Sequence, residues 1–484
     1  MRTKILLVLA LVALMAAPAF AAVQNVKVSG DIDSTYINRQ DFNLGTSTGP
    51  TVPDGLVNQN AFITQTRVRI DADLSDNVST TVGLINERAW DAETGVAGSQ
   101  DTDVQLYLAY ATLREFLYSP LTLSVGRQVF HYGNGLILGD GGVNNAATGN
   151  LAGVAADLTK RTSYDGVKAI LDYKPLTLDL IYFKNSSSAT NTGAVTAAGV
   201  PATANDSTVF GINANYQLGD PMNTAVEGYL FSRINGKNAP AALAGAGATG
   251  LENDTLYVPG LRISTNPING LNVQGEVAWQ TGNKQVTGGG LAGGDNQRRE
   301  AMAYQFMGSY TLPVLEKYKP MVNASFTHVS GDKNAGTSTS STRSASREVF
   351  QAWDPLNEAQ GSGTIYNTLY NLTNMNIFTV GGTVTPMEDV TVSAAWSHLA
   401  ADKLFSAVQN PLTLIQPDGS SGGAITPVMS GRSLGNEYDA NINYAYTEDV
   451  TFGMSFGWYV PGKDFAEANR NIASQALAHV LVNF

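Results

Sequence analysis

Hydrophobic and polar side chains alternate along most of the chain, in segments of about ten residues separated by clusters of Gly, Asn, Asp and Ser. The clearest segment runs from Phe62 to Leu74, where the even positions are mainly apolar. Its odd positions include Gln65, Arg67, Arg69, Asp71 and Asp73. Successive side chains of a β-strand point to opposite faces, so one face of this segment suits lipid and the other suits water.

The same alternation recurs in other parts of the chain. Around 103–113, Leu108 and Tyr110 fall on the apolar side and Tyr107 on the polar side. Around 437–446, the polar side carries Glu437 and Asp439. A soluble β-sandwich is the alternative source of such alternation, but its polar face would lie outside.

The alternating segments predict about eighteen strands, an even number as single-chain bacterial barrels require. They lie near 25–37, 61–74, 79–90, 103–113, 121–132, 164–174, 176–184, 208–218, 224–234, 256–265, 271–281, 302–312, 320–331, 373–384, 390–400, 435–446, 450–459 and 475–484. Short turns, such as 174–175, 386–389 and 447–449, are interleaved with long polar loops, such as 133–163, 332–372 and 401–434. This sorting predicts an all-β fold, a transmembrane antiparallel up-and-down β-barrel with short periplasmic turns and long extracellular loops.

The N-terminal segment has the order of a secretory signal peptide. Arg2 and Lys4 precede an apolar run, and the small-residue triplet Ala19-Phe20-Ala21 follows. We therefore expect a signal peptide at 1–21 and one barrel domain at 22–484; a retained membrane anchor is the alternative. No later stretch approaches the roughly 20 consecutive apolar residues of a helical span, so membrane insertion requires a closed barrel.

Composition and the position of the first strand argue against two classes of protein, nucleic-acid binders and plugged transporters. The chain has no cysteine, only 14% charged residues and a formal net charge of −12. An acidic chain without a long Lys/Arg cluster argues against a nucleic-acid partner. The first strand begins close to the expected cleavage site, which leaves no room for the globular plug of 22-stranded transporters.

Three stretches carry motifs of a known family. The first stretch has two parts, which a loop separates. From Leu121 the chain reads LTLSVGRQVFHYGNGLILGD, and from Lys160 it reads KRTSYDGVKAILDYKPLTLDLIYF. The second stretch is FQAWDPLNEAQGSGTIYN, and the third is LGNEYDANINYAYTEDVTFGMSFGWYVPGKDF. A Gly-Arg-Gln strand, then a loop, then an Asp-Gly-Val strand resembles the hallmark of the alginate export family. The matching residues are Gly126, Arg127, Gln128, Gly139, Asp140, Arg161, Asp165, Gly166, Phe350, Asp354, Pro355, Leu356, Gly435, Glu437, Asp439, Pro461 and Gly462.

The resemblance implies a monomeric 18-stranded barrel in the bacterial outer membrane that passes a polysaccharide, with an inward-reaching loop around Asp354. The best-known member of this family passes a polyanion through an arginine-rich constriction, whereas this chain is acidic. We therefore expect a porin or export channel for saccharides, an anionic polysaccharide such as alginate among them, or for other small hydrophilic solutes. The alternative is a structural or surface-interaction barrel whose lumen is filled by the 332–372 loop.

The expected partners are outer-membrane lipids and the barrel-assembly machinery. The last segment carries apolar side chains at alternating positions from Ala476 to the terminal Phe484. This ending resembles the assembly signal of outer-membrane barrel proteins.

Candidate pore-lining or substrate-binding residues come from the polar faces. Arg67, Arg69, Asp71 and Asp73 share one face and would orient a hydrated sugar or ion; the alternative is that they pair with one another. Glu437 and Asp439 share the polar face of a late strand.

Arg127 presents a conflict with strict alternation, which places it on the lipid face. A mid-bilayer Arg there costs about 2–4 kcal/mol, so we expect a β-bulge beyond Gly126 that turns it inward, a position at the membrane interface being the alternative. With Gln128, Arg161 and Asp165 it forms a candidate site, against which a structural salt bridge is the rival interpretation.

No catalytic or metal site is expected. The four histidines, His131, His328, His398 and His479, lie on separate predicted strands, and none falls beside an activated nucleophile. We expect no enzyme activity, no cofactor and no metal. Trp90, Trp279, Trp396 and Trp458 lie at or near strand segments, as the aromatic girdles of a membrane barrel require.

Overall fold

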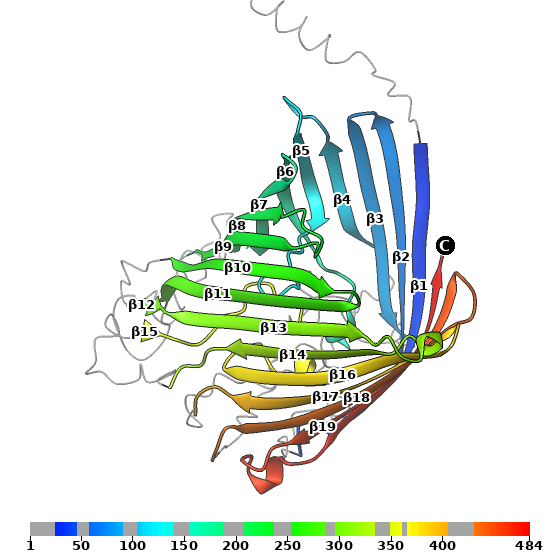
Figure 1. Ribbon diagram of the computed structural model, residues 1–484, viewed down its shortest axis with the longest axis vertical. Helices are drawn as coiled ribbons and strands as arrows, with labels where there is room; N and C mark the ends of the chain where they lie inside the picture. The colour runs from blue at the N-terminus through cyan, green and yellow to red at the C-terminus, as the bar shows by residue number, and fades with distance from the viewer. Residues whose placement is uncertain are drawn as a thin grey trace, which may run out of the picture.

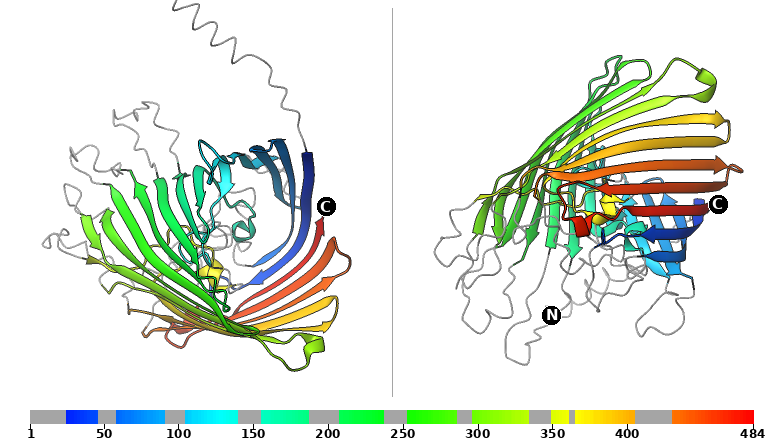
Figure 2. Two further views of the ribbon diagram at one scale, coloured as in Figure 1. Left: turned by 45° about the horizontal axis from the view of Figure 1, so that its top comes forward. Right: turned by 90° about the horizontal axis from the view of Figure 1, so that it is seen from below.

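The computed structural model describes residues 25–45, 58–90, 104–139, 155–186, 207–236, 253–285, 296–333, 349–360, 365–404 and 430–484. Their strands form one continuous sheet that closes on itself, because the last strand, β20 (Ala473–Asn483), pairs antiparallel with the first, β1 (Asn25–Gln40). The closure is visible in Figures 1 and 2, where the C-terminus lies beside β1. A closed sheet leaves no edge strand, so every wall strand is paired on both sides.

Eighteen strands form the barrel wall. Besides β1 and β20 they are β2 (Gln59–Ser75), β3 (Val78–Ala89), β4 (Gln105–Leu113), β5 (Leu121–Val129), β6 (Ser163–Asp172), β7 (Leu176–Ser186), β8 (Ser207–Gln217), β9 (Ala225–Asn235), β10 (Asp254–Ile268), β11 (Leu271–Gln285), β13 (Ala301–Thr311), β14 (Met321–Val329), β16 (Met375–Met387), β17 (Val390–Ala401), β18 (Ser433–Ala445) and β19 (Val450–Pro461). Two short strands, β12 (Asn296–Arg299) and β15 (Val349–Phe350), pair parallel beside the loop ends of the wall.

Each segment expected from the alternation corresponds to one wall strand, so the predicted barrel fold is confirmed. The connections are also sorted as expected, since 76–77, 173–175 and 388–389 are short turns at one end and the long loops emerge at the other. The expected signal peptide at 1–21 lies outside the described residues. Among the residues that the structure describes, no helix is long and apolar enough to cross a membrane.

The alternation along β2 separates the two faces of the wall as expected. Gln65 is buried at 3% exposure inside the barrel, while Phe62 is 42% exposed outside. Every apolar side chain on the outer face would meet lipid, and every polar one inside would meet water or a loop. The four tryptophans predicted for the girdles, Trp90, Trp279, Trp396 and Trp458, are all exposed on the outer face.

In β4, the expectation that Leu108 and Tyr110 lie on the apolar outer face was wrong. Gly83 pairs with Leu108 while Leu84 pairs with Leu106, so Tyr107 is an extra residue in the ladder. This bulge shifts Leu108 and Tyr110 to the lumen side, against the simple alternation. Leu108 is accordingly buried at 5% exposure.

Candidate functional site in the barrel lumen

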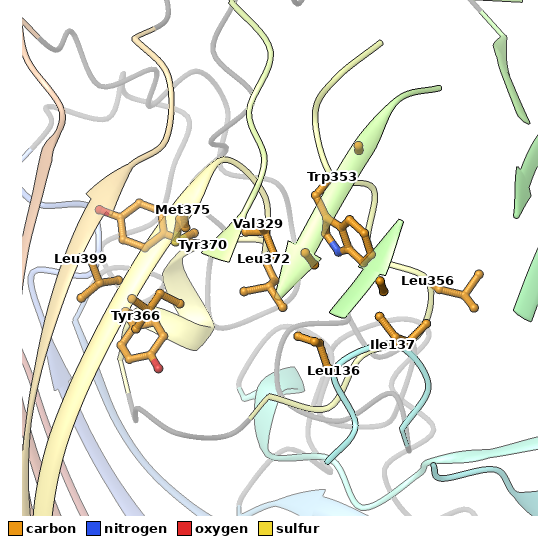
Figure 3. Close-up of a cluster of buried hydrophobic side chains, with 14 of the residues drawn as sticks. Leu136, Ile137, Val329, Trp353, Leu356, Tyr366, Tyr370, Leu372, Met375 and Leu399 are labelled. Carbon is orange, nitrogen blue, oxygen red and sulfur yellow. The ribbon is translucent and has the colours of Figure 1, made fainter. Parts of the chain in front are cut away.

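Two of the long loops fold into the barrel. The first follows β5, and residues 130–139 and 155–162 of it are described; the second joins β15 to β16 and includes the short helix α2 (Tyr366–Leu369). Buried apolar side chains of both loops pack against the loop ends of the wall strands. Figure 3 shows Ile137 of the first loop near Trp353 of the second, and Leu372 near Val329 of the wall. The two loops therefore share a hydrophobic core inside the lumen.

Backbone hydrogen bonds join the two loops to each other. Gly139 N donates to Asn357 O (2.7 Å), Asn357 N to Ile137 O (3.2 Å) and Ala359 N to Gly135 O (2.8 Å). A side chain on Gly139 would collide with Ala359, so this family-matching glycine permits the close approach of the loops. The two loops consequently act as one body, which we call the inner plug (130–139 with 351–360 and 365–374).

Asp354 is the electrostatic anchor of the inner plug. Its carboxylate lies 2.8 Å from Arg299 Nη1, 2.9 Å from Arg233 Nη2 and 3.4 Å from Lys284 Nζ, all on the barrel side. Burial alone would raise the pKa of Asp354, but the positive charges of Arg233, Lys284 and Arg299 outweigh it and hold the pKa well below its usual range. The carboxylate is therefore charged at neutral pH and fixes the loop to the wall.

Glu437 is a second anchor of the same loop. Its carboxylate accepts the backbone N–H groups of Ile365 (2.9 Å) and Tyr366 (2.7 Å), at the start of α2. Helix N-terminal N–H groups lack intrahelical partners and favour a negative charge. The sequence placed Glu437 on the lumen face, where it lies, but α2 covers it completely. Asp439, two residues along, also faces inward and is buried.

Residues 155–162, the part of the first loop that precedes β6, lie on β1 to β3 and form a row of ion pairs there. Asp157 pairs with Arg39 (2.6 Å), Lys160 with both Asp31 (3.1 Å) and Asp33 (2.9 Å), and Arg161 with Glu87 (3.2 Å). Arg161 was expected to join Arg127 and Asp165. It instead lies inside the barrel against Glu87, because the loop passes over β3.

The charged residues of β2 lie on the lumen face as the alternation indicated. Arg67 Nε lies 2.7 Å from Asp31 Oδ1, and Arg69 Nε lies 2.8 Å from Asp71 Oδ2. Asp73, on the same face, pairs across the sheet with Ser79 of β3. Arg69 and Asp71 therefore do pair with one another, and their charges are compensated within the wall.

Arg127 and Asp165 do not line the lumen, so the expected bulge was wrong. The β5–β6 register is unbroken from Leu121↔Leu171 to Val129↔Ser163, and Arg127 stands directly opposite Asp165 on the outer face. Two hydrogen bonds, of 2.9 and 2.6 Å, join them, and their side chains are 42% and 62% exposed. Arg127 lies two residues from the loop-side end of β5 beside a carboxylate, so the penalty of a lone mid-bilayer charge does not apply.

Gln128 is on the lumen side of β5, yet it is not exposed to the pore. Its side-chain amide donates to the backbone carbonyls of Ser124 (3.2 Å) and Gly166 (3.3 Å), and the residue is 5% exposed. Its contacts are structural ones within the wall.

Most positive charges on the described lumen wall and at the plug contacts are paired with carboxylates, whereas Lys168 on the lumen side of β6 lies over the rings of Phe130 (5.4 Å from Nζ to the ring centre) and Tyr132 (5.7 Å). Each of the following contacts an Asp or Glu: Arg39, Arg67, Arg69, Lys160, Arg161, Arg233, Arg262, Lys284 and Arg299. Breaking a buried ion pair by removing one partner costs about 3–5 kcal/mol. A polyanion would have to displace these carboxylates to gain the same cations.

Beside the inner plug the lumen keeps a polar cavity of about 420 Å³, here called the side cavity. It lies between β1, the 158–160 segment of the first loop and strands β17 to β20. Its lining is Asp33, Thr35, Gln65, Leu158, Lys160, Ser393, Asn441, Asn443, Gly453, Met454, Ser455, Leu477 and His479. Sequence reasoning missed Asp33 and Lys160, although Asp31, Asp33 and Thr35 occupy alternating positions of the first strand.

A closed barrel with an apolar outer wall, a polar lumen and inward loops is an outer-membrane channel of the porin class. A family model described as Alginate export matches residues 25–479. The chain therefore belongs to the alginate export family, and its place is the bacterial outer membrane. Members of this family and the similar solved structures are channels, which are not enzymes.

Several solved porins have a similar fold. OpdK of Pseudomonas aeruginosa, solved with vanillate, has a TM-score of 0.55 at 11% identity over 96% of this chain and 99% of that one. OccK11 (OpdR) of the same organism has a TM-score of 0.53 at 11% identity, covering 96% of each chain. OccK2 (OpdF), also of P. aeruginosa, has a TM-score of 0.52 at 11% identity over 96% of this chain and 98% of that one. At this identity the likeness shows the fold alone. No curated protein matches the sequence.

Proposed function

We propose that the barrel is a passive channel for neutral saccharides and other small hydrophilic solutes. The observation that carries this proposal is the compensation of lumen charges, because a pore without a row of uncompensated arginines offers a polyanion little attraction. The side cavity supports it further, since its lining offers hydroxyl and amide groups in the space beside the inner plug. An anionic polysaccharide such as alginate is correspondingly disfavoured as the substrate.

Liposome swelling tests this proposal directly. Proteoliposomes should swell in glucose and more slowly in maltotriose, because the inner plug narrows the passage. Oligouronates of equal length should enter no faster than the neutral oligomers. Faster entry of the uronates would contradict the proposal and indicate a polyanion channel.

A second candidate is a structural barrel whose lumen the inner plug closes. The shared hydrophobic core of the two loops favours it, since such a core holds the plug in place. Absence of swelling in every sugar, from protein shown to be folded by heat-modifiable migration in gels, would favour this candidate.

We also propose that residues 1–21 are removed on export, so that the barrel domain spans 22–484. The alternating terminal strand would serve the assembly machinery, and the channel would act as a monomer.

A further inference from the structure

We propose that the side cavity is a binding subsite for one ring of a neutral saccharide. This inference rests on the channel function proposed above and names the substrate class of the lumen more closely. A volume of about 420 Å³ falls within the range of small-molecule sites, roughly 300–1,000 Å³.

One side of the cavity holds a fixed carboxylate beside an ammonium group. Asp33 Oδ2 lies 2.9 Å from Lys160 Nζ, and Asp33 Oδ1 accepts a hydrogen bond from Thr35 Oγ1 (3.3 Å). His479 Nδ1 lies 3.5 Å from the same carboxylate. An adjacent acceptor and donor suit a vicinal diol, which can donate one hydroxyl proton to the carboxylate and accept from the ammonium.

The charges on this side cancel. Lys160 pairs with both Asp31 and Asp33, and Arg67 pairs with Asp31. Two carboxylates therefore face two cations, and an anionic or cationic solute gains no net attraction. A neutral solute with many hydroxyls avoids the desolvation penalty that a charged one would incur.

The opposite side of the cavity is neutral and polar. Asn441 of β18 contacts Ser393 of β17 (3.4 Å) and Ser455 of β19, and Asn443 is exposed towards the cavity. Amides and hydroxyls both donate and accept, as sugar hydroxyls do. Leu158 and Leu477 add apolar surface for the C–H face of a ring.

A glycine sets the position of the His479 ring in the cavity wall. Any side chain at Gly453 would collide with the His479 ring, so the ring lies against the bare backbone of β19. The cavity is thus formed by features of β1, the first loop and β17 to β20 together.

Saturation-transfer NMR on the refolded barrel in lipid nanodiscs tests the inference without relying on transport. Maltotriose is the neutral probe and a trimeric uronate is the charged one. We expect saturable binding of maltotriose and weaker binding of the uronate. Asp33→Asn, which keeps the shape but removes the charge-assisted hydrogen bond, should weaken maltotriose binding by about tenfold.

Asn441→Leu, which fills the neutral side, should also weaken maltotriose binding, and it keeps the test independent of how Asp33→Asn folds. The matched control is Asn323→Leu, on the lumen face of β14 outside the cavity, which should leave binding unchanged. Equal binding by wild type, Asp33→Asn and Asn441→Leu would overturn the subsite, as would tighter binding of the uronate. If sugars swell liposomes but do not bind saturably, the subsite fails while the channel function stands; binding without swelling overturns the channel alone.

Discussion

Replacing Asp354 by Asn is expected to raise single-channel conductance severalfold. The substitution removes a carboxylate that contacts Arg233, Lys284 and the fully buried Arg299. Lys284 and Arg299 keep their pairs with Asp254, whereas Arg233 loses its ion-pair partner. Removing one partner of a buried ion pair costs about 3–5 kcal/mol, more than the 1.4 kcal/mol that changes an equilibrium tenfold. The inner plug should therefore leave the wall for a substantial fraction of the time.

Planar bilayer recording of Asp354→Asn measures this effect, and the loss of the carboxylate that pairs with Arg233 should also shift the pore towards anion selectivity. Asp165→Asn is the matched control, since it breaks an Asp–Arg pair of the outer face and should leave conductance unchanged. Unaltered conductance in Asp354→Asn would show that the plug does not depend on this anchor.

The wild-type plug should stay in place at mildly acidic pH. The pKa of Asp354 is lowered from 3.8, so its stabilising charge is fully present above that value and is lost only as the pH falls through the lower pKa of the folded protein. Recordings of wild type at pH 4.5 and pH 7 should consequently give the same low conductance, with Asp354→Asn high at both.

The second large effect is expected from Glu437→Gln. A glutamine can accept with one oxygen, but its amide group would face a backbone N–H donor of Ile365 or Tyr366 in a fully buried place. A buried donor left without an acceptor costs about 1–3 kcal/mol. Helix α2 should loosen, with more frequent conductance fluctuations and faster protease cleavage in the second loop.

Asp71→Asn is the control for Glu437→Gln, because Asp71 also pairs in the lumen but lies on β2 against Arg69. It should change neither the fluctuations nor the cleavage rate. If both anchors hold one plug, the double variant Asp354→Asn/Glu437→Gln should show less than the sum of the two single effects. Strict additivity would indicate that the two anchors hold parts of the second loop that move independently.

The fold could be predicted from sequence because strand alternation is a local property. Each strand repeats with period two, and the outer face must be apolar over its whole membrane height. The same rule placed Arg67, Arg69, Glu437 and Asp439 on the lumen side correctly. It was wrong at Leu108 and Tyr110 because the extra residue Tyr107 leaves no compositional trace.

The interior of the barrel could not be predicted in this way. Asp354 contacts Arg299 because the second loop folds back into the lumen. Lys160 contacts Asp33 although the two residues are 127 positions apart in the chain. Such contacts depend on loop paths, which have no periodic signal. The bulge expected at Arg127 was wrong for a related reason, since the height of a residue in the membrane and its cross-strand partner Asp165 are known only once the register is known.

The most direct test of the charge-compensated lumen is the reversal potential of wild-type protein across a planar bilayer under a salt gradient. Because most lumen cations are paired with carboxylates, we expect stable current steps without anion selectivity and no block by added oligouronates. A strongly anion-selective reversal potential with block by oligouronates would contradict the account and establish a polyanion channel.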